Sequence, residues 1–242
     1  SVFKTFTIAA ALEAGLIETE TKFLNLKKKL KCGKNTISEY DNKIPSDLTV
    51  EQILIRSGNI GSVRIGQKLE IEKLKNFLNK IGILKKIDFD IEEVGEPIPF
   101  RWGKCKLATV SFGHGITTTP LQLATGYSII SNGGFEIKPT LIKDSLKKYK
   151  KKRIIKAGVS EKINPILRKI VNTKEGTAGL ANINGYEVGG KTGTAESYKS
   201  KAKVNTFVAV FPTSRPKYTL VVLMDEPKLS SDYVYNYRNK KG

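Results

Sequence analysis

Residues 189–224 read GGKTGTAESYKSKAKVNTFVAVFPTSRPKYTLVVLM, and this stretch decides the fold. Two runs rich in β-branched and aromatic residues, Val204 to Phe211 and Tyr218 to Met224, predict strands. The short turn between them, Pro212 to Pro216, makes the two strands an antiparallel hairpin. The glycine-rich run Gly189 to Thr194 precedes them, and we expect it to begin an edge strand of the same sheet.

The chain before this sheet is mostly helical. Residues 2–14 are apolar, contain strong helix formers and stop at Gly15, which predicts a buried helix. Residues 18–48 are polar and turn-rich, and residues 88–106 are expected to form a loop. Apolar spacing and capping residues predict further helices from Thr49 to the break at Ser57, from Ile60, over 70–81, from Pro120 to about Gly133, and over 160–172. Early helices and late strands indicate an α+β fold.

The composition is that of a globular protein without a membrane span. Of 242 residues, 39% are hydrophobic and 27% charged, enough for one domain with two lobes. The net charge is +19, but much of the excess lies in the lysine runs 27–31 and 147–156, which have little aromatic interleaving. We therefore interpret them as solvated loops or hairpins and expect no nucleic-acid partner; approach to an anionic lipid or polymer is the alternative.

Few residues are suited to metal or histidine chemistry. Cys32 and Cys105 lack the spacing of metal ligands, cannot form a disulfide framework, and do not decide the compartment. The single histidine, His114, lies between two glycines rather than on a firm element. We expect no metal and no cofactor, and any serine nucleophile would use a base other than histidine.

Ser1 and Lys4 form a Ser-x-x-Lys pair at the start of the apolar helix. A spacing of three places both side chains on one helix face, and the helix N-terminus favours a developing oxyanion. A lysine can take the serine proton if burial or another cation, such as Lys191, lowers its pKa. Taken alone, the pair could equally be helix surface. The same pattern also occurs at Ser145/Lys148, Ser200/Lys203 and Ser214/Lys217, none of which opens an apolar helix.

Two further short motifs carry polar groups suited to a cleft. Ser57-Gly58-Asn59 lies in a break between helices and can present a hydroxyl and an amide, although it could simply cap a helix. Tyr40-Asp41-Asn42 offers the same pair of groups, but no helix follows it. Lys191-Thr192-Gly193 begins a strand, where a lysine and a hydroxyl can bind a carboxylate, and the glycine lets a substrate backbone approach.

Ser1/Lys4, Ser57/Asn59 and Lys191-Thr192-Gly193, in that order, resemble the three signature elements of penicillin-binding proteins and serine β-lactamases. Other stretches are similar to class B monofunctional penicillin-binding proteins: Gly176-Thr177-Ala178, 190–196, 112–115 and 119–123. The stretches 57–61 and 224–227 resemble the division-specific, FtsI-like branch in particular. No Glu-x-x-Leu-Asn-type element is found that would activate a deacylating water, so rapid β-lactam hydrolysis is not expected.

The resemblance implies an α+β sandwich in which helices cover an antiparallel sheet beside a mostly helical lobe. Residues 1–242 would be one transpeptidase domain, with the helical lobe over about 16–135 and the sheet lobe over 1–15 and 136–228. The domain would be truncated at both ends, without the family's N-terminal strands and C-terminal helix.

The resemblance also implies a serine D,D-transpeptidase. Ser1 would attack the D-Ala-D-Ala carbonyl of a peptidoglycan stem peptide, with Lys4 as the base. Ser57, through Lys191, would pass a proton to the leaving amine, and Asn59 would hold the amide of the stem.

The remaining roles fall on the strand that carries Lys191. The backbone N–H groups of Ser1 and Thr194 would form the oxyanion hole. Thr192 and Thr194, together with Lys191, would bind the terminal carboxylate beside Gly193. β-Lactams would acylate the same serine.

Biological context is also implied by resemblance. The expected partners are peptidoglycan stem peptides, β-lactam antibiotics and, in the full-length protein, divisome or elongasome membrane proteins. The expected place is the periplasmic face of the bacterial inner membrane, held there by an upstream anchor, and septal wall synthesis is the expected role.

Two other functions fit parts of the sequence. Gly185 and Gly190-Lys191-Thr192 match a phosphate-binding P-loop formally, and Val221 to Glu226 resembles a magnesium-binding strand. However, a P-loop requires a buried strand before it and an amphipathic helix after it, and neither is evident. A non-catalytic penicillin-binding sensor or fragment is the third possibility.

Overall fold

The computed structural model describes residues 1–143, 151–196, 202–228, 236–237 and 240–241. The helices are α1 (Phe3–Glu13), α2 (Val50–Ile55), α3 (Asn59–Lys80), α4 (Lys104–Phe112), α5 (Pro120–Ser131) and α6 (Ala157–Asn172), with a short 3-10 turn η1 (Gly179–Ala181). The strands are β1 (Lys22–Phe23), β2 (Lys29–Cys32), β3 (Asn35–Ser38), β4 (Leu48–Thr49), β5 (Gly189–Glu196), β6 (Lys203–Phe211), β7 (Tyr218–Asp225), β8 (Asn236–Tyr237) and β9 (Lys240–Lys241).

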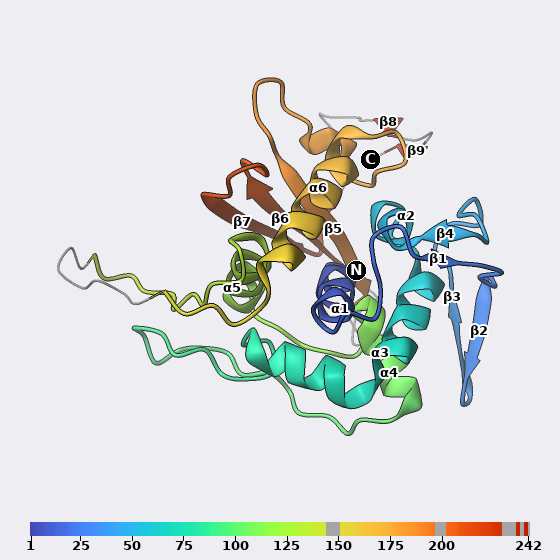
Figure 1. The fold of residues 1–242 in the computed structure, drawn as a ribbon, viewed down its shortest axis with the longest axis horizontal. Helices are drawn as coiled ribbons and strands as arrows, with labels where there is room; N and C mark the ends of the chain where they lie inside the picture. The colour runs from blue at the N-terminus through green and yellow to red at the C-terminus, as the bar shows by residue number, and fades with distance from the viewer. Residues whose placement is uncertain (144–150, 197–201, 229–235, 238–239, 242) are drawn as a thin grey trace.

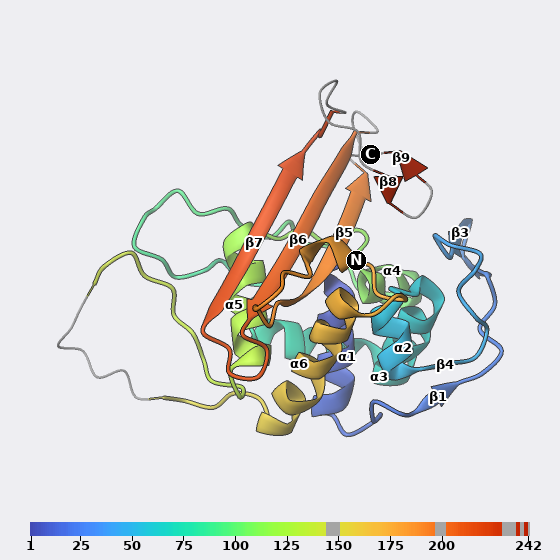
Figure 2. The same ribbon diagram turned by 90° about the horizontal axis from the view of Figure 1, so that it is seen from above.

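The main sheet has the strand order β5-β6-β7, and both pairs are antiparallel. The predicted hairpin is confirmed as β6 and β7, and β5 is an edge strand as expected (Figure 2). On the outer side of β7 the described residues provide no further strand, and Leu220, Val222 and Met224 are exposed. Alternate residues of a strand share a face, so these three side chains leave one face of β7 open. The predicted α+β fold is confirmed.

Helix α1 forms the centre of the molecule. Every residue from Phe3 to Leu12 is buried, as expected for a helix that is apolar all round. α2, α3 and α4 pack against it, and α5 and α6 contact both α1 and the sheet (Figures 1 and 2). Burial on all sides fixes the direction in which the first turn of α1 presents its side chains.

The predicted lobe boundary near residue 135 assigns α5 to the helical lobe. However, α5 packs against β6, β7 and α6. We therefore propose a sheet lobe that includes α5 as well as α1 and the chain from α6 onward, and a helical lobe made of α2, α3 and α4 with the small strands before them.

Two helix boundaries differ from the sequence predictions. The helices predicted from Ile60 and over 70–81 are one element, α3, with a break at Glu70, whose φ of 66° is left-handed. Helix α4 starts at Lys104, inside the predicted loop, and buries Leu107 and Val110. Pro97 and Pro99 favour a loop and lie only a few residues before Lys104, so the sequence did not show where the loop ends and the helix begins.

Cys32 in β2 and Cys105 in α4 form a disulfide with an S–S distance of 2.20 Å. The two residues are 73 positions apart, so spacing could not reveal the pair. The bond ties the β2–β3 hairpin to the start of α4. The sequence excluded a framework of several disulfides and did not predict this single bond.

Gly66 is the point of closest approach between α3 and α4. A Cβ at this position would lie 1.8 Å from Ser111 Oγ, which is buried and donates to the carbonyl of Leu107 at 2.7 Å. We expect Gly66→Ala to lower the free energy of unfolding by about 1–3 kcal/mol, because overpacking outweighs the better helix propensity of alanine. Urea denaturation would measure the change.

Gly158→Ala provides the matched control, since Gly158 also lies in a helix, α6, but a Cβ there would meet nothing within 4 Å. We expect this change to be neutral or to stabilise by up to about 1 kcal/mol. If the Gly66 variant were as stable as the Gly158 variant, the proposed close packing of α3 and α4 would be wrong.

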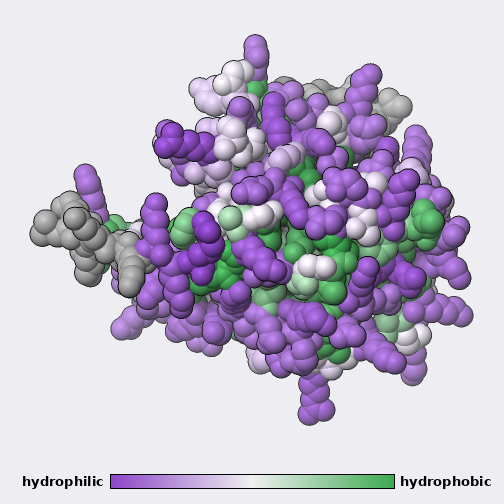
Figure 3. All heavy atoms as spheres, viewed as in Figure 1, coloured by the Kyte–Doolittle hydropathy of each residue, from purple (hydrophilic) through white to green (hydrophobic). Residues whose placement is uncertain are grey.

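Hydrophilic side chains cover most of the face seen in Figure 3 and lie over many elements rather than one. This spread agrees with interpreting the lysine-rich segments as solvated; the run 147–156 is described only from residue 151. In the part of the chain that the structure describes, no helix has the length and apolar content needed to cross a membrane.

Candidate active site

The N-terminus of α1 places Ser1 and Lys4 side by side. The Lys4 ammonium is fully buried, and its Nζ donates to Ser1 Oγ at 3.0 Å. Tyr127 of α5 holds this turn, since its buried hydroxyl lies 2.8 Å from both the Val2 carbonyl and Thr5 Oγ1. The geometry expected from a spacing of three is therefore present.

Ser57 joins this pair from the break between α2 and α3. A capping box at Thr49 starts α2, and the helix ends in time for Ser57 to adopt a φ of 58°. A left-handed conformation is uncommon for a residue with a side chain and is typical of functional sites. Lys4 Nζ donates to the carbonyl of Ser57 at 2.7 Å and to its Oγ at 3.0 Å.

Lys191 approaches the same hydroxyl from the edge strand β5. Its Nζ is fully buried and donates to Ser57 Oγ at 2.8 Å and to the Thr192 carbonyl at 3.1 Å. Ser57 Oγ therefore lies between two lysines, Lys4 and Lys191. These groups come from positions 4, 57 and 191, and the fold brings them to one place.

Gly193 allows β5 to lie directly against the start of α1. A Cβ at Gly193 would lie 3.1 Å from Val2 Cγ1 and 3.8 Å from the nitrogen of Ser1. The sequence suggested that this glycine makes room for a substrate backbone. The structure adds a second reason, because a side chain here would push the strand away from Ser1.

Burial controls the charge of both amines. Desolvation lowers the pKa of Lys4 well below its usual value; Lys191 lowers it further, whereas Glu39 raises it. Desolvation lowers the pKa of Lys191 from 10.5 to about 7. Near neutral pH the two amines can therefore exchange protons with the hydroxyls between them, which is what acid–base chemistry on a serine requires.

Thr192 and Thr194 line the same strand. Thr194 is exposed, and Thr192 Oγ1 lies 2.9 Å from the Oγ1 of Thr177, which belongs to the Gly-Thr-Ala stretch. A small apolar hollow beside them is lined by Thr177, Thr192, Phe207 and residues of η1. Exposed hydroxyls along a strand edge can accept an extended ligand.

Asn59 lies on the first turn of α3, two residues after Ser57. Its side-chain amide donates to the carbonyl of Ser38 at 2.9 Å. One of its side-chain N–H groups is therefore engaged with the protein.

Sequence reasoning missed the residues that support this site. Glu39 accepts hydrogen bonds from the backbone of α3's first turn, although no local pattern marked it. Gly113 has a φ of 89°, and a Cβ at this position would lie 2.9 Å from Phe3 Cβ and 3.2 Å from the nitrogen of Ser1. A glycine next to a helix end was the available signal for the second residue.

The structure describes the competing motifs only in part, and those of their side chains that it describes are mostly exposed. His114 is exposed and stacks on Phe112, and Tyr40 is 55% exposed. Ser214 bonds to Glu187 at the surface, while Ser145, Lys148 and Ser200 lie outside the described residues. The P-loop interpretation is wrong, because Lys191 and Thr192 lie within strand β5 rather than in a turn that opens a helix.

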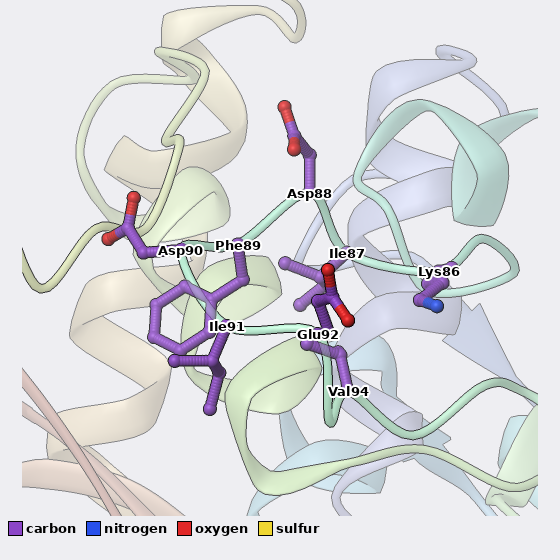
Figure 4. A pocket seen from close by; sticks show the side chains of 8 residues that line it. All are labelled: Lys86, Ile87, Asp88, Phe89, Asp90, Ile91, Glu92 and Val94. Atoms are coloured by element: carbon purple, nitrogen blue, oxygen red, sulfur yellow. The ribbon is translucent and has the colours of Figure 1, made fainter.

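A cavity of about 610 Å³ lies elsewhere in the fold. Residues of one loop line it, from Lys86 to Val94, and none is a candidate site residue. Asp88 and Asp90 point in different directions (Figure 4), and Asp90 bonds to Thr140 at 2.7 Å. Within the described ranges no three His, Cys, Asp or Glu residues are grouped as metal ligands. Asp90 therefore connects this loop to the segment at Thr140, and the cavity contains none of the candidate site residues.

Comparisons with known proteins point to one family. Residues 1–241 match the penicillin binding protein transpeptidase domain. The chain is 30% identical to a probable peptidoglycan D,D-transpeptidase FtsI of Caulobacter vibrioides, over 94% of this chain and 41% of that protein. It is also 30% identical to a probable peptidoglycan D,D-transpeptidase PenA of Neisseria flavescens, over 96% of this chain and 59% of that protein. The chain thus spans less than two thirds of either relative.

Solved structures share the fold. The transpeptidase domain of penicillin-binding protein 3 from Burkholderia pseudomallei superposes with a TM-score of 0.85 at 23% identity, covering 93% of this chain and 70% of that one. Penicillin-binding protein 3 from Mycobacterium tuberculosis in complex with aztreonam gives a TM-score of 0.84 at 22% identity, covering 94% and 56%. At these identities the likeness establishes the architecture.

Proposed function

The chain belongs to the penicillin-binding protein transpeptidase domain family, with class B, FtsI-like homologues, and from this membership we propose that it is a serine D,D-transpeptidase acting through Ser1. One observation carries the proposal: Ser57 Oγ lies between the Nζ atoms of Lys4 and Lys191, and Lys4 Nζ also reaches Ser1 Oγ at 3.0 Å. A serine hydroxyl beside a buried amine that can act as its base is suited to nucleophilic acyl transfer, and the second hydroxyl and amine can supply the proton for the leaving group.

The first half of the reaction forms an acyl-enzyme. Neutral Lys4 takes the proton of Ser1, whose oxygen bonds to the carbonyl carbon of the penultimate D-Ala. The backbone N–H groups of Ser1 and Thr194 stabilise the oxyanion, each donor contributing about 3 kcal/mol in comparable enzymes. The C–N bond then breaks, and the terminal D-Ala leaves as an amine after receiving a proton through Ser57.

The second half reverses the proton transfers. An amine of another stem peptide attacks the acyl-enzyme and loses its proton through Ser57, while Lys4 returns a proton to Ser1 Oγ as the ester bond breaks. One amide thus replaces another without net oxidation. Thr192, Thr194 and Lys191 hold the terminal carboxylate of the donor, and Asn59 holds its amide. A β-lactam would occupy the same place and acylate Ser1.

Mass spectrometry tests the proposal directly. Incubation with penicillin should add the mass of one ring-opened drug, mapped to the peptide that contains Ser1. A D-Ala-D-Ala peptide or thioester with an added amine should give free leaving group and transpeptidated product. Acylation without turnover would instead indicate a penicillin-binding sensor, and absence of an adduct would rule out both functions.

We also propose that the protein acts at the periplasmic face of the inner membrane, in septal wall synthesis with divisome proteins. The Cys32–Cys105 disulfide supports an oxidising compartment, where such bonds persist. The 30% identity to an FtsI relative supports the septal role. Depletion should produce filamentous cells; rounded cells would instead indicate a role in elongation.

A further inference from the structure

The carboxylate of Glu39 lies at the N-terminus of α3. Its Oε2 accepts from the backbone N–H of Asn59 at 2.7 Å, and its Oε1 accepts from that of Ile60 at 2.8 Å. The residue at the cap position, Gly58, has no side chain with which to make these bonds. A carboxylate from another segment therefore satisfies the first two donors of the helix, where negative charge is favoured.

These bonds constrain the residue that the reaction uses. Ser57 comes immediately before the capped turn and holds a left-handed φ of 58°. The carbonyl of the neighbouring Ser38 accepts from Asn59 Nδ2 at 2.9 Å. Ser38 and Glu39, at the end of β3, therefore both hydrogen-bond to the residue that follows Ser57-Gly58. Without these hydrogen bonds, Ser57 could relax toward an ordinary backbone conformation, and its Oγ would leave the position between the two lysines.

The charge of Glu39 also reaches Lys4. Two ionisable side chains act on that amine: Lys191 from β5 and Glu39. Only Glu39 among them is an anion, and it favours the protonated form of Lys4. Loss of the carboxylate should therefore change both the geometry of Ser57 and the pH at which Lys4 becomes a base.

We propose that Glu39 is a positioning residue for acyl transfer, which holds Ser57 between Lys4 and Lys191 by binding the first turn of α3. The inference rests on the proposed function. It adds a residue outside the three signature motifs, and Glu39 acts through Ser57 and Lys4 rather than on the substrate.

The test is the kinetics of acylation by penicillin in Glu39→Gln, with the binding constant of the non-covalent complex separated from the acylation rate constant. Glutamine keeps the shape but has one acceptor oxygen and no charge. We expect the rate constant to fall about 10- to 100-fold, as small displacements of a reacting group do, and the binding constant to change little. The rising limb of the pH profile should move to lower pH, because the pKa of Lys4 falls.

Glu13→Gln is the matched control. The Glu13 carboxylate also accepts from the backbone at a helix start, the N–H of Lys156 at 2.8 Å, but at the opposite end of α1. We expect its acylation rate and pH profile to match those of the wild type. Glu39→Asp, which retains the charge, should restore the position of the pH limb and part of the rate.

The outcomes separate the two proposals. If the wild type is not acylated, the proposed function fails, and the role of Glu39 fails with it. If the wild type is acylated and Glu39→Gln reacts at the same rate with the same pH limb, only the role of Glu39 is overturned. Equal losses of rate and thermal stability in the Glu13 and Glu39 variants would also overturn it, since they would reflect helix capping alone.

Discussion

Ser1→Ala is expected to abolish covalent labelling by penicillin, with a loss of about a million-fold, as when a serine protease loses its nucleophile. Lys4 Nζ lies 3.0 Å from the hydroxyl of Ser1 and 3.0 Å from that of Ser57, which is itself buried between two lysines. Ser1 is partly exposed, so the variant should keep its fold. Fluorescent penicillin on a denaturing gel, alongside thermal unfolding, would measure both effects.

Ser214→Ala is the control for this experiment. Ser214 also precedes a lysine, Lys217, by three residues, but its hydroxyl bonds to Glu187 at the surface. Its replacement should leave labelling unchanged. Wild-type labelling of Ser1→Ala would refute the assignment of the nucleophile, and loss of label in Ser214→Ala would show that the wrong Ser-x-x-Lys pair was chosen.

The site residues that could be predicted from the sequence are those whose positions are set by the residues next to them in the chain. The Ser1/Lys4 pair could be predicted because one helical turn relates the two residues and the following residues are apolar. Lys191 could be placed at a strand edge because the hairpin after it is rich in β-branched and aromatic residues and has a short turn. Ser57 could be selected because a capped helix ends just before it.

The supporting residues could not be predicted, because their partners lie far away in sequence. Glu39 binds residues 20 and 21 positions later, and Tyr127 binds the start of α1 across more than 120 positions. Cys32 and Cys105 meet only once α4 packs beside the β2–β3 hairpin. The sequence pattern draws attention to Tyr40-Asp41-Asn42, whereas the residue that binds the first turn of α3 is Glu39, immediately before it.

The buried amines predict a bell-shaped pH dependence of acylation. The base must be neutral, so the rate should rise as pH increases through the lowered pKa of Lys4. Lys191 must carry a proton to supply the leaving group and bind the carboxylate, so the rate should fall as pH passes its pKa of about 7. The two limbs belong to the coupled pair of amines as a whole.

Lys191→Met should lower the acylation rate constant by about 10²- to 10⁴-fold, the usual contribution of a general acid. The falling limb of the pH profile should disappear. The rising limb should move to higher pH, because Lys191 no longer lowers the pKa of Lys4. Stopped-flow acylation across the pH range would record all three changes, and an unchanged rate would contradict the proposed role.

Lys191→Met should also change the free energy of unfolding by an amount that depends on pH. This pH dependence distinguishes the effect of the lysine charge from that of packing. Lys191 has a pKa of about 7 when folded and 10.5 as its ordinary value, so between these values the unfolded chain binds more protons. The free energy of unfolding of the wild type therefore rises with pH between about 7 and 10.5. Below this range the buried, protonated amine destabilises the folded state. We expect Lys191→Met to be more stable than the wild type below pH 7, with the difference shrinking toward pH 10.5. A constant difference in urea denaturation across this range would mean that Lys191 is not held in the folded state with a lowered pKa, and that the substitution acts through packing alone.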